Sequence, residues 1–138
     1  METTTQSATQ ANVQLVQKCY GYFGEGNIPA LLNELTEDIK WVSPGPKTIP
    51  WAGNYGGRQA VGEFFKKLAE NVDFQAFEPR EFFAQGNRVV ALGYGEMTAK
   101  KTGKKVKEDW AMTFTIKNGK VSHFREYINT WEAANALS

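Results

Sequence analysis

The amino-acid sequence predicts an α+β domain in which three helices precede a run of antiparallel strands. Apolar residues recur at helical spacing through the first half of the chain, whereas from Val72 onward they alternate with the period of a strand. Asn118–Gly119 separates two such alternating stretches, and this dipeptide is a strong signal for a two-residue β-hairpin turn. Helices followed by a run of strands are typical of the α+β class.

Length and composition favour one globular domain. The chain has 138 residues, 41% of them hydrophobic and 22% charged, with a net charge of +1. We expect residues 1–8 to form a disordered tail and residues 9–138 to form a single domain. The balanced charge argues against a nucleic-acid partner, and no apolar run approaches the ~20 residues that cross a membrane. The first residues lack the features of a secretory signal, so we expect a cytoplasmic location.

The sequence carries no metal or cofactor motif. It has one cysteine and one histidine, which are too few ligands for a zinc site. Gly56 and Gly57 precede a predicted helix, but the segment lacks the Gly-Lys-Ser/Thr ending of a phosphate-binding loop. We therefore expect no cofactor and no metal. Cys19 falls on the apolar side of the first helix, so we interpret it as a core residue.

The first half contains the predicted helices. The first begins near Thr9 and ends at the glycines at 24 and 26. Asn27 is a candidate N-cap for a second, short helix, with Pro29 just inside it and an end near Glu37. An apolar stripe beginning at Val61 predicts the third helix, after residue 57.

A strand and a long loop separate the second and third helices. Residues 39–43 alternate as a strand, which Pro44 ends. The loop over residues 44–57 is rich in proline and glycine, yet it holds Ile49, Trp51 and Tyr55. Large apolar residues in a loop usually fold back over something. The loop is either a wall over a pocket or a plug for the end of the core, and the sequence favours neither.

The second half reads as strands. We predict one long bent strand or two short ones over 73–85, then strands over 88–98 and 106–117. The lysine-rich stretch 100–105 is interpreted as a solvated turn. On the strand over 106–117, side chains at alternate positions share a face. The inward set is predicted to be Val106, Glu108, Trp110, Met112, Phe114 and Ile116.

The hairpin turn predicts how the last two strands pair. If Asn118–Gly119 is a two-residue turn, Lys117 lies opposite Lys120, and the register continues from there. The expected opposite pairs are Phe114 with His123, Met112 with Arg125, Trp110 with Tyr127, and Glu108 with Asn129. These eight side chains would share one face and line a pocket. The reverse face could pack against a second sheet, which makes a homodimer through the sheet an expectation.

The polar members of that face are the candidate catalytic residues. His123 has the side chain whose ordinary pKa lies closest to neutral pH, and an apolar setting could raise that of Glu108. Arg125 could stabilise negative charge, and Asn129 could orient a substrate. The alternatives are a histidine near the turn that is exposed or bonded to backbone, and an Arg125–Glu108 ion pair within the sheet. The sequence leaves both open.

Several local strings together resemble those of the nuclear transport factor 2-like superfamily, in its SnoaL-like, ketosteroid-isomerase-related branch. The strings span roughly residues 10–131, and they are Gly21-Tyr-Phe-Gly-Glu-Gly-Asn27, Glu37-Asp-Ile-Lys-Trp41, Ile49-Pro-Trp-Ala-Gly53, Phe64–Phe65 and Arg125-Glu-Tyr-Ile-Asn-Thr130. The resemblance implies a cone-shaped curved antiparallel sheet wrapped around the three helices, with an apolar cavity at its open end. It also implies frequent dimers through the back of the sheet. Isomerisation, cyclisation, dehydration and epoxide hydrolysis occur among such proteins, mostly without a cofactor, and other members only bind ligands or proteins.

The chain departs from the family at the catalytic positions. Ser43 stands where ketosteroid isomerases have their catalytic aspartate, and their oxyanion-hole tyrosine falls at Cys19 or Tyr20. Asn129 stands where the cyclases carry an acid–base aspartate, and an amide cannot abstract a proton. Glu108, opposite Asn129 in the predicted register, is the carboxylate that could substitute.

These observations predict a pocket protein for a small apolar ligand, which could act as a cofactor-independent isomerase, cyclase or hydratase/hydrolase. The alternative is a non-catalytic module for binding a hydrophobic ligand or for dimerisation. A third interpretation has the cavity filled by tryptophan side chains. The predicted catalytic residues are Glu108, His123, Arg125 and Asn129. The predicted pocket residues are Tyr20, Trp41, Ser43, Trp51, Tyr55, Trp110, Met112 and Tyr127.

Overall fold

A computed structural model describes residues 2–138, with side chains from residue 8 onward. It has four helices and one six-stranded sheet in the described range. The helices are α1 (Glu2–Glu25), α2 (Ile28–Asn33), α3 (Arg58–Asn71) and α4 (Thr130–Leu137). The strands are β1 (Leu35–Ser43), β2 (Gly53–Gly56), β3 (Val72–Gln85), β4 (Arg88–Ala99), β5 (Lys105–Lys117) and β6 (Lys120–Tyr127).

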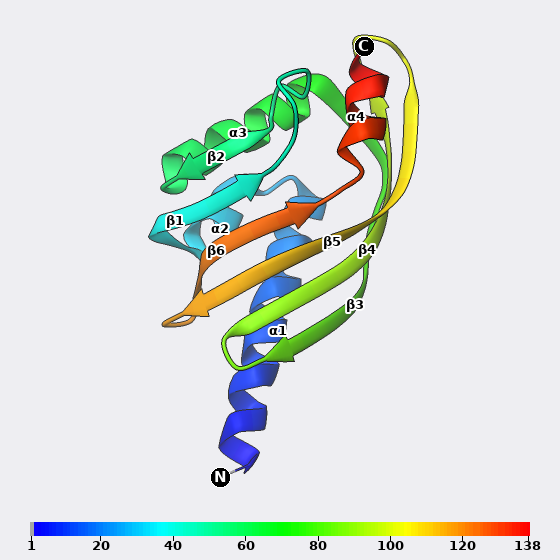
Figure 1. The fold of residues 1–138 in the computed structure, drawn as a ribbon. Helices are drawn as coiled ribbons and strands as arrows, with labels where there is room; N and C mark the ends of the chain where they lie inside the picture. The colour runs from blue at the N-terminus through cyan, green and yellow to red at the C-terminus, as the bar shows by residue number, and fades with distance from the viewer. Residues whose placement is uncertain (1) are drawn as a thin grey trace.

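The sheet is curved and open, with α1, α2 and α3 packed against its concave side (Figure 1). Its strand order is β2-β1-β6-β5-β4-β3. Every neighbouring pair is antiparallel except β1 and β6, which run parallel. This arrangement confirms the predicted α+β class and the curved sheet around N-terminal helices. The core lies between the helices and the concave face.

The helix ends follow the local sequence. The side chain of Asn27 accepts a hydrogen bond from the amide of Ala30 at 3.2 Å, which confirms the predicted N-cap of α2. α1 begins at Glu2, ahead of the expected start near Thr9. α4 lies at the end of the chain, where we predicted no helix from the sequence, and Asn129 caps it by accepting a hydrogen bond from the amide of Glu132 at 3.2 Å.

β3 is one long strand whose bend comes from two register shifts. One lies between Phe74 and Ala76 and the other between Pro79 and Glu81. Such bulges bend a strand and increase its twist. The proline falls at the second shift, and β3 is an edge strand; bulges and edge strands are the places where a sheet tolerates proline. β3 therefore curves over the end of the cavity instead of breaking in two.

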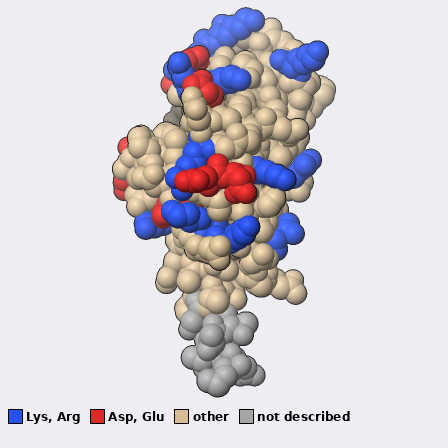
Figure 2. Space-filling model, turned by 90° about the vertical axis from the view of Figure 1, so that its left-hand side faces the viewer, with Lys and Arg blue, Asp and Glu red and all other residues tan. Residues whose placement is uncertain are grey.

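Basic and acidic side chains lie close together on the face that Figure 2 shows, with no broad surface of one sign. This mixture agrees with the net charge of +1. None of the helices between residues 2 and 138 is long and apolar enough to cross a membrane.

Candidate functional site

The predicted face of β5 is confirmed by its burial. Side chains at even positions from Val106 to Ile116 point inward, and all are buried except Glu108, which is partly exposed. Asn118 and Gly119 both have positive φ angles, 52° and 77°, as a two-residue type I′ turn requires. Lys117 pairs with Lys120, so the hairpin begins in the predicted register.

The predicted register is wrong beyond the first two pairs. Ile116 pairs with Val121, but the next pair joins Thr115 to His123, so Ser122 is an extra residue on β6. The hydroxyl of Ser122 donates a hydrogen bond to the carbonyl of Thr115 at 3.2 Å. This β-bulge moves every later side chain of β6 to the other face, because the side-chain period of a strand is two.

The bulge separates the residues that we expected to share a pocket. His123, Arg125 and Tyr127 are exposed on the outer face of the sheet. The guanidinium of Arg125 lies 5.5 Å from the ring centre of Tyr127. Asn129 lies at the N-terminus of α4. The structure therefore does not bring His123 or Arg125 together with Glu108. A catalytic role for these residues stays a prediction.

The concave side encloses a cavity of about 100 Å³. Helices α1, α2 and α3, the β1–β2 loop and the five strands other than β2 contribute to its wall. Five of the eight predicted pocket residues line it: Tyr20, Trp41, Trp51, Trp110 and Met112. Trp51 places the β1–β2 loop at the wall of this cavity. The cavity lining includes three tryptophans, yet the space among them stays open.

Stacked aromatic rings form much of the wall. The rings of Trp41 and Phe124 stack with centroids 3.7 Å apart, and those of Phe77 and Trp110 stack at 4.9 Å. Trp110 lies flat because its opposite neighbour on β4 is Gly93. A Cβ on Gly93 would come within 2.3 Å of Trp110 Cζ2 and 2.5 Å of a carbonyl oxygen, so only glycine fits there.

The remaining predicted pocket residues lie near the cavity or away from it. Ser43 is buried behind the wall, where its hydroxyl donates a hydrogen bond to Glu126 Oε1. The hydroxyl of Tyr55 donates to the carbonyl of Trp51 at 2.8 Å, so it holds the loop. Tyr127 is 50% exposed on the outer face.

Glu126 is the site residue that the sequence reasoning missed. The bulge turns it inward, where it is only 7% exposed and lines the cavity. Burial raises the pKa of its carboxyl, and the hydrogen bond from Ser43 partly opposes that rise. A signal was present in the sequence, because Val121 and Phe124 are apolar three positions apart. That spacing breaks strict alternation and indicates an extra residue in the strand.

Glu108 is the second carboxyl at the cavity. Burial raises its pKa to about 7, while the backbone amide of Asn129 lowers it and the negative charges of Glu126 and Glu132 raise it further. Its Oε2 atom is buried and has no hydrogen-bond partner within the described chain. A carboxyl with a pKa near 7 can both give and accept a proton at neutral pH.

A tyrosine from α1 completes the polar lining. The hydroxyl of Tyr20 donates to the sulfur of Met112 at 3.1 Å, and burial raises the pKa of this phenol. Tyr20 therefore stays protonated at neutral pH, and its hydroxyl can turn from the weakly accepting sulfur of Met112 to donate a hydrogen bond to a ligand. No group of three or more His, Cys, Asp or Glu side chains gathers in the described residues as a metal site would need.

The sequence and the fold match a known family. The family model of the SnoaL-like domain matches residues 16–124. The chain belongs to this SnoaL-like family, within the nuclear transport factor 2-like superfamily. No curated protein matches the sequence.

Solved structures of the same fold include proteins from two Burkholderia species. A nuclear transport factor 2-like protein from Burkholderia xenovorans LB400 is 37% identical, with a TM-score of 0.86, over 94% of this chain and 98% of its own. One of unknown function from Burkholderia pseudomallei K96243 is 25% identical, with a TM-score of 0.86, over 93% and 98%. TerC, crystallised with polyporic acid, is 24% identical, with a TM-score of 0.83, over 92% and 98%.

Proposed function

We propose that the protein binds a small, largely apolar molecule in its cavity and transfers a proton on it, without a cofactor. The reaction class is isomerisation, cyclisation or hydration. One observation carries the proposal: Glu108 presents a carboxyl with a pKa of about 7 at an aromatic cavity, and one of its oxygens has no partner among the described residues. General acid–base catalysis is most efficient when the pKa of the catalytic group lies near the working pH.

In this proposal, Glu108 is the acid–base and Tyr20 the donor. Glu108 removes a proton from the substrate and returns it at another position, or delivers it to a leaving hydroxyl. The phenol of Tyr20 donates a hydrogen bond to the oxygen on which negative charge develops. Glu126 supports the role of Glu108, since its negative charge helps to raise the pKa of Glu108.

The test compares the intact protein with two variants on a panel of unsaturated ketones, β-hydroxy ketones and epoxides. Removing a positioned acid–base group typically slows a reaction ~10²–10⁴-fold, so we expect a loss of that size in Glu108→Gln. His123→Ala, on the outer face, should keep the wild-type rate. Equal rates in wild type and Glu108→Gln would remove Glu108 as the acid–base. Ligand binding without turnover on any compound would favour the non-catalytic binding module.

We also propose a homodimer through the outer face of the sheet. Two cross-strand rows on β3, β4, β5 and β6 place apolar and small side chains there, with Phe83 54% and Tyr127 50% exposed. Contiguous exposed apolar surface is a mark of an interface. The two rows consist of Phe83, Val90, Thr113 and Arg125, and of Glu81, Leu92, Ala111 and Tyr127, so each row has one charged side chain at its end.

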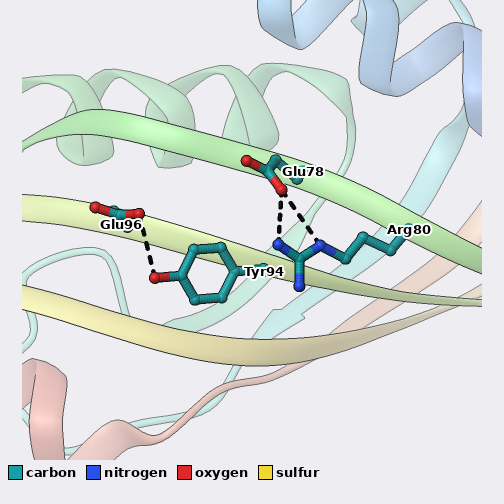
Figure 3. A network of polar contacts seen from close by, with 4 residues as sticks. All are labelled: Glu78, Arg80, Tyr94 and Glu96. Atoms are coloured by element: carbon teal, nitrogen blue, oxygen red, sulfur yellow. Dashed lines mark hydrogen bonds and ion pairs between the residues drawn. The ribbon is translucent and has the colours of Figure 1, made fainter.

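A polar network borders these rows at the β3–β4 end (Figure 3). Arg80 donates to Glu78 Oε1 from Nε at 3.2 Å and from Nη2 at 2.8 Å, and its guanidinium lies 4.7 Å from the ring centre of Tyr94. The hydroxyl of Tyr94 donates to Glu96 at 3.2 Å. Interfaces commonly have an apolar centre and a polar rim.

Sedimentation velocity tests the dimer. Ala111→Arg places a charged side chain at the centre of the rows and should convert the dimer to a monomer. Glu63→Arg, which adds an arginine on the exposed side of α3, is the matched control and should stay dimeric. The wild-type protein is measured at two concentrations that differ 100-fold. If it is monomeric at both, the proposal is refuted.

A further inference from the structure

The cavity has an unbalanced set of charges. Two carboxyls, those of Glu108 and Glu126, belong to its lining. Among residues 8–138, whose side chains are described, no lysine, arginine or histidine lines it. The other polar groups at the wall are hydrogen-bond donors: the phenol of Tyr20 and the buried indole N–H groups of Trp41 and Trp110, which have no described partner. None of the described side chains at the cavity supplies a cation that would neutralise an ionised carboxylate there.

Two carboxyls at an apolar cavity are costly to ionise. Burial disfavours the charged form of each, and the charge of one disfavours that of the other. A ligand that carries a positive charge would offset both effects at once. An anionic ligand would add to the repulsion, and a neutral ligand would leave it unchanged.

The aromatic side chains of the cavity wall also favour a positively charged ligand. The face of an aromatic ring attracts a cation, and tryptophan does so most strongly. Trp41 and Trp110 both line the cavity, and each is stacked on a phenylalanine that fixes the plane of its indole. An apolar body bearing one ammonium group would therefore meet aromatic rings on its sides and carboxylates at its charged end.

We infer that the ligand of this cavity is a hydrophobic amine: a ring-sized apolar body that carries one protonated nitrogen, with the ammonium facing Glu108 and Glu126. The inference rests on the proposed function, since it assigns a chemical class to the ligand of the same cavity. It goes beyond that function because the acid–base proposal requires no charge on the ligand. The cavity volume of about 100 Å³ limits the enclosed part of the ligand to no more than one small ring.

Other titratable groups facing Glu108 reinforce the preference for a cation. Glu126 reaches it from β6 and Glu132 from α4, and both charges are negative. From α1, Tyr20 and Cys19 line the cavity. Burial raises the pKa of Cys19 to about 12 and that of Tyr20 as well, so both side chains are neutral between pH 5 and 8. Glu108, with a pKa of about 7, changes its charge within that range.

Titration calorimetry of the intact protein with three matched probes tests the inference. The probes are phenethylamine, phenethyl alcohol and phenylacetate, which share one ring and differ in charge. At pH 8 we expect the amine to bind at least about tenfold more tightly than the alcohol, because a charge-assisted hydrogen bond is roughly twice as strong as a neutral one. Phenylacetate should bind most weakly.

The pH dependence gives a second readout. Below pH 7 the amine must displace the proton of Glu108, so its affinity should fall by up to about tenfold per pH unit, with proton release into the buffer. The affinity of the alcohol should stay flat. Glu108→Gln should abolish the preference for the amine while keeping the affinity for the alcohol, which also shows that the cavity is intact. Glu63→Gln removes a carboxylate from the exposed side of α3 and should change nothing.

The outcomes separate the inference from the proposed function. If the alcohol binds as tightly as the amine at both pH values, the amine class is wrong and the cavity still binds apolar ligands. If the preference for the amine survives in both Glu108→Gln and Glu126→Gln, the charge that attracts it lies elsewhere and the inference falls. If no probe binds, both proposals fall. If Glu108→Gln does not fold, Glu126→Gln is used to test whether the preference for the amine is lost.

Discussion

Replacing Glu108 by glutamine should flatten the dependence of stability on pH. In the folded protein the pKa of Glu108 is raised from 4.5 to about 7. The folded state therefore keeps a proton between pH 4.5 and 7 that the unfolded chain has released. Protons favour the state that binds more of them, so the free energy of unfolding should fall as the pH rises through this window and level off above it.

The magnitude follows from the same two pKa values. A rise of about 2.5 pH units, from 4.5 to about 7, corresponds to ~3.4 kcal/mol at ~1.36 kcal/mol per unit. Solvent reaches part of the Glu108 side chain and screens its charge, so we expect about half of this, ~1–2 kcal/mol. Glutamine has nearly the shape of a protonated glutamate and does not titrate. Glu108→Gln should therefore be more stable than wild type at pH 8 and nearly equal to it at pH 5.

Urea unfolding, followed by circular dichroism at half-unit steps from pH 5 to 8, measures this difference. Glu63→Gln is the control for the loss of one exposed carboxylate. Some slope should remain in Glu108→Gln because burial also raises the pKa of Glu126. The reasoning is refuted if wild type gains stability between pH 5 and 7, or if both proteins have the same slope.

Three further substitutions test other parts of the structure. Gly93→Ala should lower the free energy of unfolding by about 2 kcal/mol or more and shift tryptophan emission, because the new Cβ would overlap the ring of Trp110. A urea midpoint unchanged from wild type would contradict the close packing. Asn129→Ala removes the N-cap of α4 and should lower the free energy of unfolding, measured in urea, by about 1 kcal/mol, with turnover unchanged. A loss of turnover at full stability would give this residue the catalytic role that the sequence suggested. His123→Ala should change ligand affinity less than twofold by fluorescence titration, and a larger loss would bring the outer face into the site.

The predictable parts of the fold are those fixed by local chemistry. Asn118–Gly119 determines the hairpin turn because both positions require positive φ, and alternation over β5 determines which side chains face the helices. α4 could also have been predicted, since Asn129 followed three positions later by Glu132 is an N-terminal capping pattern.

The site was less predictable because one residue decides its occupants. Ser122 is polar, yet it is buried in the bulge, and its sign in the sequence is limited to the three-position spacing of the apolar residues Val121 and Phe124. In the predicted register, which lacks the bulge, β6 would present His123 and Arg125 to the cavity. In the structure, β6 presents Glu126 instead. The residue identities alone therefore suggested a site with His123 and Arg125 beside Glu108, whereas the register places a second carboxyl, that of Glu126, beside it.

The position of β6 in the sheet order has a consequence for how the chain assembles. β6 is the last strand in the sequence, and it lies between β1 and β5. Until it is synthesised, β1–β2 with α3 and the β3–β4–β5 meander have no strand to join them. Each then presents an open edge that can pair with another chain. The sheet therefore closes only after nearly the whole chain is available, and a truncation before residue 120 would leave two separate edges exposed.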